Sequence, residues 1–340
     1  MAVHDVAYVE LYTRDNLSTI DYFVSAMGFT RVADTVAKDQ SSVLLQQGEV
    51  RLVVTSGRGI IRFLEQHGDG VADVALTCDD VAATAAAAEA AGATVTHSAQ
   101  GVPVVSGFGE VVHTLLPADP LVNGLPAGRS WMPTPGDTGT TANGRITRLD
   151  HVAVCLEGGT LEKYADFYRE AFGFSRYSSE YVSVGDQAMD SIVVRSDSGS
   201  AIFTLVAPDP DKEPGQLDHF LERNGGEGVQ HLAFLTGEII TAVQECRDRG
   251  IVFLDTPDSY YDVLGERLGG LNQQIEELRD VKVLADRDEW GDLLQLFTRS
   301  PYPRNTLFFE LIQRDGSRGF GSANIRALYE AVERDRLAAG

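Results

Sequence analysis

Hydrophobic and polar positions alternate in two similar blocks of this chain. One block is DVAYVELYTRDNLSTIDYFVSAMGFT from Asp5, and the other is LDHVAVCLEGGTLEKYADFYREAFGFS from Leu149. Each opens with an apolar residue at every second position, which is typical of a half-buried strand. Each continues with a helical pattern that carries an aromatic pair and ends in Gly-Phe, where glycine favours a helix end. Both blocks therefore predict a strand followed by a helix.

A second pattern also occurs twice. GDGVADVALTCDDVAATAAAAEAAGATV begins at Gly68 and GEGVQHLAFLTGEIITAVQECRDRGIVF begins at Gly226, and each predicts a strand, a turn, a helix and a new strand. A weaker match links EVVHTLLP from Glu110 with LFFELIQR from Leu307. Repeats of this kind indicate duplicated α+β modules built from βαβ units with additional strands.

The segment between the two copies has little periodicity and is rich in Pro, Gly and Thr, as expected of a linker. We therefore predict a first domain at residues 1–116, a linker at 117–146 and a second domain at 147–340. The second copy is longer, with extra sequence at 252–296 and a tail from Gly319. These additions suggest that the second domain holds the functional site.

Three polar residues interrupt the apolar strands of the second half. They are His151 in LDHVAV, His231 in VQHLAF and Glu310 in FFELIQ. A buried carboxylate needs a cation or strong hydrogen-bond donors, because its desolvation is costly. Two imidazoles and one carboxylate from three strands match the facial triad of non-haem Fe(II) oxygenases. We predict a metal site at these residues.

The matching positions of the first half read as Tyr8, Asp73 and His113. This set lacks the two imidazoles, so we expect a first domain without metal and interpret His113 as a core or vestigial position. The remaining histidines lie at the terminus, in polar turns or on a solvated helix, where a structural role is the simpler interpretation.

Composition narrows the function further. The 340 residues carry 28 Lys and Arg against 50 Asp and Glu, a net charge of −22, which disfavours nucleic acid and anionic membrane surfaces as partners. Three isolated cysteines favour a reducing environment over a disulfide framework. The sequence shows neither an apolar run long enough to cross a bilayer nor a signal-peptide pattern at MAVHDVAYVELY, so we expect a cytoplasmic protein. We further expect a homo-oligomer.

With these motifs in view, the chain resembles the 4-hydroxyphenylpyruvate dioxygenase family of the vicinal-oxygen-chelate fold. The resemblance rests on LDHVAV, GVQHLAF, TPDSYYDVLGER, LLQLFT, TLFFELIQR and GFGSANIRALYEAVE. It implies duplicated βαβββ modules with curved mixed sheets, Fe(II) at His151, His231 and Glu310, and 4-hydroxyphenylpyruvate and O2 as substrates. The α-keto acid of the substrate would chelate the iron, so that no second keto acid is needed.

The family contains two activities on this substrate. After decarboxylation, oxidation of the ring gives homogentisate, and oxidation of the benzylic carbon gives 4-hydroxymandelate, a precursor for glycopeptide-type antibiotics. This chain reads Ala323-Asn324-Ile325 where dioxygenases usually have a GNF-like segment, and Leu205-Val206-Ala207-Pro208 where they usually have Asn in an LNEP-like strand end. Both departures resemble the mandelate-forming branch. Because a barrier difference of about 1.4 kcal/mol changes a product ratio tenfold, Ile325 in place of Phe is a candidate for aiming the benzylic carbon.

The resemblance also suggests which residues contact the substrate. They are Ser191, Thr204, Gln230, Gln295, Phe297, Phe320, Asn324 and Ile325, with Ile325 and Gln295 as the candidate catalytic residues. Simple strand alternation turns Gln230 away from His231. The spacing of apolar residues from Ile325 onwards predicts a C-terminal lid helix after the glycines of GFG.

Three alternatives remain at this level. A dioxygenase that forms homogentisate would share every metal ligand. A metal-free binding protein of the same fold would not need the intact triad. An extradiol catechol dioxygenase would share the triad type, but the TPDSYYD and GFGSAN segments do not resemble that group.

Overall fold

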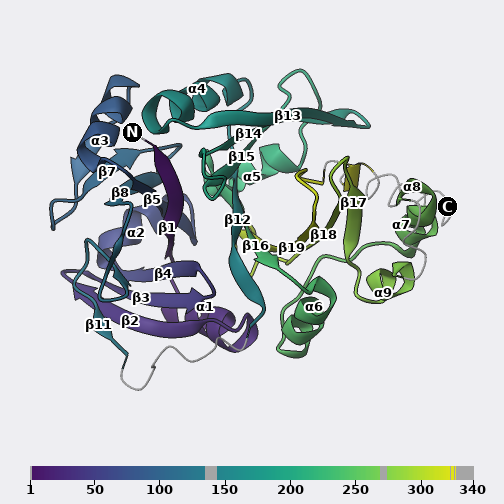
Figure 1. The fold of residues 1–340 in the computed structure, drawn as a ribbon, viewed down its shortest axis with the longest axis horizontal. Helices are drawn as coiled ribbons and strands as arrows, with labels where there is room; N and C mark the ends of the chain where they lie inside the picture. Colours follow the sequence, from purple (N-terminus) through teal and green to yellow (C-terminus); the bar gives the residue numbers. More distant parts are fainter. Residues whose placement is uncertain (1, 135–143, 269–273, 322, 325, 327–340) are drawn as a thin grey trace.

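The computed structural model describes residues 2–134, 144–268, 274–321, 323, 324 and 326. Two large mixed sheets, one from each half of the chain, lie side by side in it (Figure 1). Within the described residues, the strand orders are β11-β2-β3-β4-β1-β5-β8-β7-β6 and β13-β14-β15-β12-β16-β19-β18-β17. Apart from β11, the two orders correspond strand for strand. The predicted α+β fold with duplicated modules is confirmed, whereas the domain boundaries at residues 116 and 147 stay a prediction.

The strands of the first sheet are β1 (Val3–Tyr12), β2 (Thr30–Ala37), β3 (Gln40–Gln47), β4 (Val50–Gly57), β5 (Gly70–Cys78), β6 (Val95–His97), β7 (Pro103–Ser106), β8 (Val112–Pro117) and β11 (Met132–Pro133). Its helices are α1 (Asn16–Asp21), which continues into a π-helical turn (Tyr22–Ala26), a short 3-10 turn (Arg58–Ile60), α2 (Ile61–Gln66) and α3 (Val81–Ala90). A small ladder of β9 (Leu121–Val122) and β10 (Leu125–Pro126) follows.

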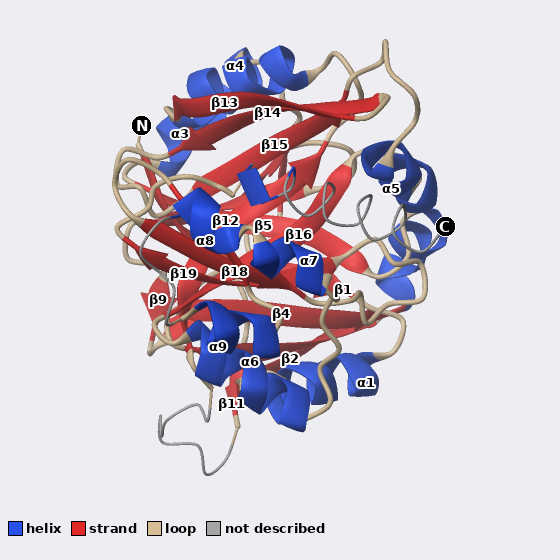
Figure 2. Ribbon diagram, turned by 90° about the vertical axis from the view of Figure 1, so that its right-hand side faces the viewer, coloured by secondary structure: helices blue, strands red, loops and turns tan. Residues whose placement is uncertain are grey.

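The strands of the second sheet are β12 (Ile146–Cys155), β13 (Ser175–Val184), β14 (Gln187–Arg195), β15 (Ile202–Pro208), β16 (Gly228–Thr236), β17 (Leu284–Arg287), β18 (Asp292–Phe297) and β19 (Phe308–Asp315). Its helices are α4 (Leu161–Phe172), α5 (Gln216–Asn224), α6 (Ile239–Asp248), α7 (Asp258–Asp262), α8 (Leu264–Leu268) and α9 (Ile275–Asp280). Helices α7, α8 and α9 come from the extra sequence of this copy and lie outside β17 and β18, in front of the sheet in Figure 2.

The duplicated sequence blocks form equivalent structures. β1 runs parallel to β4 and antiparallel to β5, and β12 has the same relation to β15 and β16. Gly28 and Gly173 close the first helical segment of each copy with left-handed backbone angles, φ +86° and +73°. Such angles favour glycine, so the repeated Gly-Phe pairs mark the same turn in both modules.

One large hydrophobic core connects the two modules. Phe23 from the first module packs edge-on against Phe309, with ring centroids 5.1 Å apart, and Phe29 packs against Phe234 at 6.0 Å. Because each sheet buries one face here, its other face is left to form a separate inner surface. In the second module, that inner surface lies inside a half-barrel formed by the curled sheet (Figure 1).

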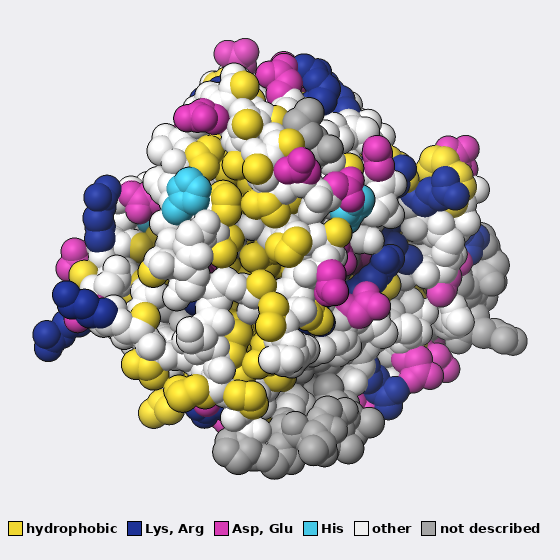
Figure 3. Space-filling model, turned by 60° about the vertical axis from the view of Figure 1, so that its left-hand side comes forward, with side chains coloured by type: hydrophobic (Ala, Val, Ile, Leu, Met, Phe, Trp, Pro, Cys, Tyr) yellow, Lys and Arg dark blue, Asp and Glu magenta, His cyan; other side chains and the backbone are white. Residues whose placement is uncertain are grey.

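In the described ranges, every helix is too short or too polar to span a bilayer. Figure 3 shows the side formed by the first module, where hydrophobic side chains gather at the centre and charged ones lie mostly at the margin. Exposed apolar residues of this half include Val36, Val122 and Met132. All three cysteines are buried and free, as expected.

Candidate metal centre

The three predicted metal ligands meet on the inner surface of the second sheet. His151 lies on β12, His231 on the neighbouring β16, and Glu310 on β19 beyond it. The carboxylate Oε2 of Glu310 is 3.5 Å from His151 Nε2 and 3.3 Å from His231 Nε2. One donor atom from each residue lies within 4.8 Å of the others, so a single ion can contact all three. Within the described ranges, this is the one such group of three His, Cys, Asp or Glu.

The donor set fits a divalent metal. The Glu310 side chain is 3 % exposed and that of His151 is 4 % exposed, so the carboxylate has little water to stabilise its charge. A cation would supply that stabilisation. The two imidazoles and one carboxylate, without a thiolate, suit a non-haem iron site. Burial lowers the pKa of His231 below its usual value, although Glu310 partly offsets this, so the imidazole is neutral and able to bind a metal.

Both imidazoles are oriented by the residue that precedes them. His151 Nδ1 lies 2.9 Å from Asp150 Oδ1, and His231 Nδ1 lies 3.2 Å from Gln230 Oε1. With Nδ1–H donating to these oxygens, each ring presents Nε2 to Glu310. A carboxylate or amide behind a ligating histidine fixes its tautomer and strengthens it as a ligand. Gln230 thus contacts the ring of His231, although strict strand alternation placed it on the opposite face.

Asp150 is in turn held by an arginine that the sequence analysis missed. Arg314 Nε and Nη2 each donate to one oxygen of Asp150 at 2.8 Å, a bidentate pair. Burial alone would raise the pKa of Asp150, but the hydrogen bonds from Arg314 and His151 hold it well below its usual range. The carboxylate is therefore charged and available to His151. The sequence offered one indication of the residues that orient the imidazoles, namely the polar residue directly before each histidine: Asp150 before His151 and Gln230 before His231.

Aromatic rings surround the two imidazoles. Phe320 packs edge-on against His151 at 5.2 Å, and Phe297 packs edge-on against His231 at 5.9 Å. The structure thus brings both predicted aromatic residues to the triad. Phe308 stacks on His231 at 5.0 Å and was not predicted, although it lies two residues before Glu310 in the same strand.

Two predicted hydroxyl residues lie on adjacent strands of the same sheet. Thr204 on β15 is 9 % exposed, and its Oγ1 has no hydrogen-bond partner within the described structure. A buried hydroxyl without a partner is unusual, so this one is free to bind a ligand. Ser191 on β14 instead donates its hydroxyl to the Glu180 carbonyl at 3.1 Å. The described contacts do not connect Ser191 with the triad.

Two of the predicted amide residues, Gln295 and Asn324, belong to another buried group. Gln295 on β18 is 2 % exposed, and its Oε1 accepts a hydrogen bond from Asn324 Nδ2 at 3.4 Å. Asn324 is fully buried, and its Oδ1 accepts from the Tyr260 hydroxyl at 2.8 Å and from Arg267 at 3.4 Å. Tyr260 and Arg267 were not predicted; both lie in the TPDSYYDVLGER motif. Ile325 and the residues of the predicted lid helix after Arg326 lie outside the described residues.

The first module has no equivalent of this triad. The pairing Asp73↔Val112 in β5 and β8 corresponds to His231↔Phe308 in β16 and β19, which makes Thr114 the counterpart of Glu310. The alignment of His113 with Glu310 was wrong by one residue, and a one-residue slip moves a side chain to the other face. His113 instead faces the shared core, where its Nε2 lies 2.9 Å from the Tyr168 hydroxyl. Burial lowers the pKa of His113 to about 4, as expected for a core residue.

Residues of the predicted linker cover the inner surface of the first module, where Leu125, Ala127 and Trp131 pack against its buried side chains. Thr114 and Tyr8 donate hydrogen bonds to the Asp73 carboxylate, at 2.5 and 3.3 Å. Arg129 from the linker pairs with Glu10 beside them and stands over the Tyr8 ring, 5.6 Å from its centroid. The guanidinium thus supplies a positive charge beside the buried carboxylates of this module.

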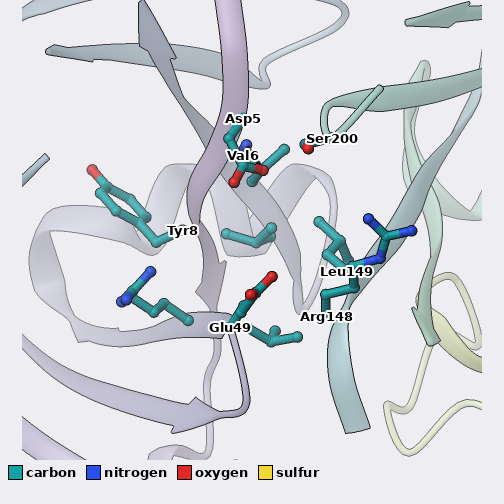
Figure 4. Close-up of a pocket in the computed structure, with 10 residues that line it drawn as sticks. Asp5, Val6, Tyr8, Glu49, Arg148, Leu149 and Ser200 are labelled. Carbon is teal, nitrogen blue, oxygen red and sulfur yellow. Dashed lines mark hydrogen bonds between the residues drawn. The ribbon is translucent and has the colours of Figure 1, made fainter. Parts of the chain in front are cut away.

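A small cleft lies between the two modules, apart from the triad. Figure 4 shows Asp5 and Val6 of β1 near Arg148 and Leu149 of β12, with Glu49 beside them. Its cavity of about 40 Å³ holds only a few water molecules. None of the predicted site residues lines this cleft, which lies in the interface between the modules. Its volume is too small for an aromatic substrate.

The chain is similar to known proteins over both modules. The family model described as Glyoxalase/Bleomycin resistance protein/Dioxygenase superfamily matches residues 5–111 and 148–282, that is, both modules. A 4-hydroxyphenylpyruvate dioxygenase of Coccidioides posadasii is 31 % identical over 98 % of this chain and 93 % of its own length. One from Neurospora crassa is 33 % identical over 82 % of this chain and 72 % of its own length.

A solved structure is also similar over the full length. A triple mutant of 4-hydroxymandelate synthase from Streptomyces coelicolor is 49 % identical, with a TM-score of 0.89, and the match covers 99 % of this chain and 100 % of that one.

Proposed function

This chain belongs to the 4-hydroxyphenylpyruvate dioxygenase family of non-haem iron dioxygenases, and from this premise we propose that it is a 4-hydroxymandelate synthase. The reaction would convert 4-hydroxyphenylpyruvate and O2 into 4-hydroxymandelate and CO2. The observation that carries the proposal is the 49 % identity to 4-hydroxymandelate synthase over essentially the whole chain, together with the His151–His231–Glu310 group.

We assign Fe(II) to the triad, since oxygen activation needs a metal that can donate electrons. When bound there, Fe(II) supplies the site where the α-keto acid and dioxygen meet and the electron exchange for decarboxylation and oxidation. His151, His231 and Glu310 would hold the ion, and a set of only three protein donors is typical of non-haem iron sites that also bind substrate and dioxygen. Zn²⁺ would bind the same ligands without supporting this chemistry.

The protein residues hold the substrate between two groups of side chains. On β15, the strand next to that of His151, the free hydroxyl of Thr204 is a candidate donor to the α-keto acid, and its buried, unpartnered state supports this role. Phe297 and Phe320 flank the imidazoles and would exclude water from the reacting carbons. Gln295 and Asn324 form a buried amide pair that suits the phenol hydroxyl at the far end of the ring. Ser191 and Gln230 stay predicted substrate contacts, although the hydrogen bond that Gln230 Oε1 accepts from His231 Nδ1–H favours a role for Gln230 behind the metal.

Product identity tests this proposal. The iron-loaded protein is incubated with 4-hydroxyphenylpyruvate and O2, and the products are separated by chromatography. We expect 4-hydroxymandelate as the main product. Homogentisate as the main product would identify the second candidate, a 4-hydroxyphenylpyruvate dioxygenase, which the curated relatives favour.

The residue proposed to select the product is Ile325. A Phe at this position would add a flat wall and shift the ring toward oxidation at the aromatic carbons. We expect Ile325→Phe to raise the ratio of homogentisate to 4-hydroxymandelate by about tenfold, which corresponds to about 1.4 kcal/mol between two barriers. Ala323→Ser, an exposed change in the same segment, serves as the control and should leave the product ratio unchanged. An unchanged ratio in Ile325→Phe would remove this residue from the explanation.

The homo-oligomer expected from the sequence also stays a prediction, and sedimentation velocity of the iron-loaded protein tests it.

A further inference from the structure

Arg314 contacts two parts of the site that are separate in the chain. One edge of its guanidinium holds Asp150, the residue behind the ligand His151, through two hydrogen bonds of 2.8 Å. Another nitrogen, Nη1, donates to the Gly319 carbonyl at 2.6 Å. The guanidinium carbon also lies 5.1 Å from the centroid of the Phe320 ring. The same planar group therefore touches the support of a metal ligand and the segment that carries an aromatic wall.

The segment from Ser317 to Gly319 is held from its other side by Asp288. The Oδ2 atom of Asp288 accepts hydrogen bonds from the Ser317 hydroxyl and from the backbone N–H groups of Arg318 and Gly319, at 2.7 to 2.8 Å. The segment thus has two independent anchors, and Asp288 touches neither His151 nor Asp150 in the described contacts. This separation allows the two functions of Arg314 to be tested independently.

We propose that Arg314 is a positioning residue that couples the orientation of the metal ligand His151 to the closure of segment 317–321 over the site. Its planar fork spans Asp150 and Gly319 at once, and a lysine ammonium cannot reproduce this geometry. Through Asp150, Arg314 sets the ring orientation and ligand strength of His151. Through Gly319, it sets the place of Phe320 against the same ring. The idea rests on the proposed function only in treating the triad as a metal site.

Three variants and two measurements test the coupling. The variants are Arg314→Gln, Asp150→Asn and Asp288→Asn, each checked by circular dichroism for intact secondary structure. The first measurement is Co²⁺ affinity of the metal-free full-length protein, titrated by its visible absorption. The second is hydrogen–deuterium exchange of the peptide that covers residues 315–321. Neither measurement uses the substrate, so a wrong product assignment leaves the test unaffected.

The coupling predicts a distinct outcome for each variant. Asp150→Asn should weaken Co²⁺ binding by about 10- to 100-fold, the usual effect of losing a partner behind a metal ligand, and leave exchange in 315–321 nearly unchanged. Asp288→Asn should speed exchange in 315–321 and leave Co²⁺ affinity within about twofold. Arg314→Gln should produce both effects. Arg314→Lys, which keeps the charge but lacks the planar fork, should also produce both effects, and it replaces Arg314→Gln if that variant does not fold.

The proposal is overturned if the Arg314 variant changes only one measurement. Loss of Co²⁺ affinity with normal exchange would mean that Arg314 serves only Asp150. Faster exchange with normal Co²⁺ affinity would mean that it is only a loop anchor.

Discussion

Removal of the Arg129 side chain should destabilise the first module, because it leaves a buried carboxylate without its cation. The Glu10 side chain is 4 % exposed and that of Arg129 is 19 % exposed, so water screens the pair weakly. Glu10 also accepts a hydrogen bond from Thr55 at 2.6 Å, which does not neutralise its charge. Breaking a buried ion pair by deleting one partner costs about 3–5 kcal/mol of folding stability. Because Arg129 is partly exposed, we expect Arg129→Met to lower the free energy of unfolding by about 3 kcal/mol, the lower end of this range.

Urea unfolding followed by tryptophan fluorescence measures this cost. The chain has two tryptophans, and Trp131 lies beside the guanidinium, which is 5.9 Å from its ring centroid. In a Trp290→Phe background, Trp131 is the sole reporter and follows the unit that contains Arg129. The double variant Arg129→Met with Glu10→Gln removes both charges and should regain most of the loss, to within about 1 kcal/mol of the parent.

Two results would refute this reasoning. A cost of Arg129→Met below about 0.5 kcal/mol would show that Glu10 does not depend on this cation. A double variant as unstable as the single variant would show that the loss comes from packing of the Arg129 stem and not from an uncompensated charge.

Three further changes test other parts of the structure. Burial and the nearby Glu10 raise the pKa of Asp73 to about 7, so the folded state binds the carboxyl proton more tightly than the unfolded state. The protein therefore loses stability as pH rises from about 4 to 7. Asp73→Asn should be more stable than the parent at pH 8 but not at pH 4, as measured by urea midpoints. Gly321 has φ +73°, and Gly321→Ala would place a Cβ 2.0 Å from Gln295 Oε1. We expect this variant to have about a tenfold higher KM for 4-hydroxyphenylpyruvate and an unchanged Co²⁺ affinity. In the control Gly237→Ala the new Cβ lies in open space, so both the KM and the Co²⁺ affinity should stay unchanged. Gln230→Leu removes the acceptor behind His231 and should weaken Co²⁺ binding by at least about tenfold; an affinity equal to that of the parent would contradict its role.

Local patterns in the sequence determined the fold class and the metal ligands. Alternating strands and Gly-Phe turns repeat because each module must form the same half-buried sheet, so the duplication is visible without coordinates. His151, His231 and Glu310 stood out because polar groups buried in a strand are costly unless a partner binds them. These are properties of short segments, and short segments are what a single sequence displays.

Contacts between distant segments were decided by the tertiary structure. Asp150 and Arg314 are 164 residues apart, and only the pairing of β12, β16 and β19 brings them together behind His151. Arg129 lay in a linker without periodicity, yet it reaches into the first module and stands over Tyr8.

Strand register also could not be predicted from the sequence. The segments EVVH and LFFE align as sequences, which matches His113 with Glu310. The strand pairings of the two sheets instead make Thr114 the residue equivalent to Glu310. Side chains in a strand alternate between faces, so this single step separates a core histidine from an inner-surface threonine. Register depends on the partner strand, and the partner is chosen only when the whole sheet forms.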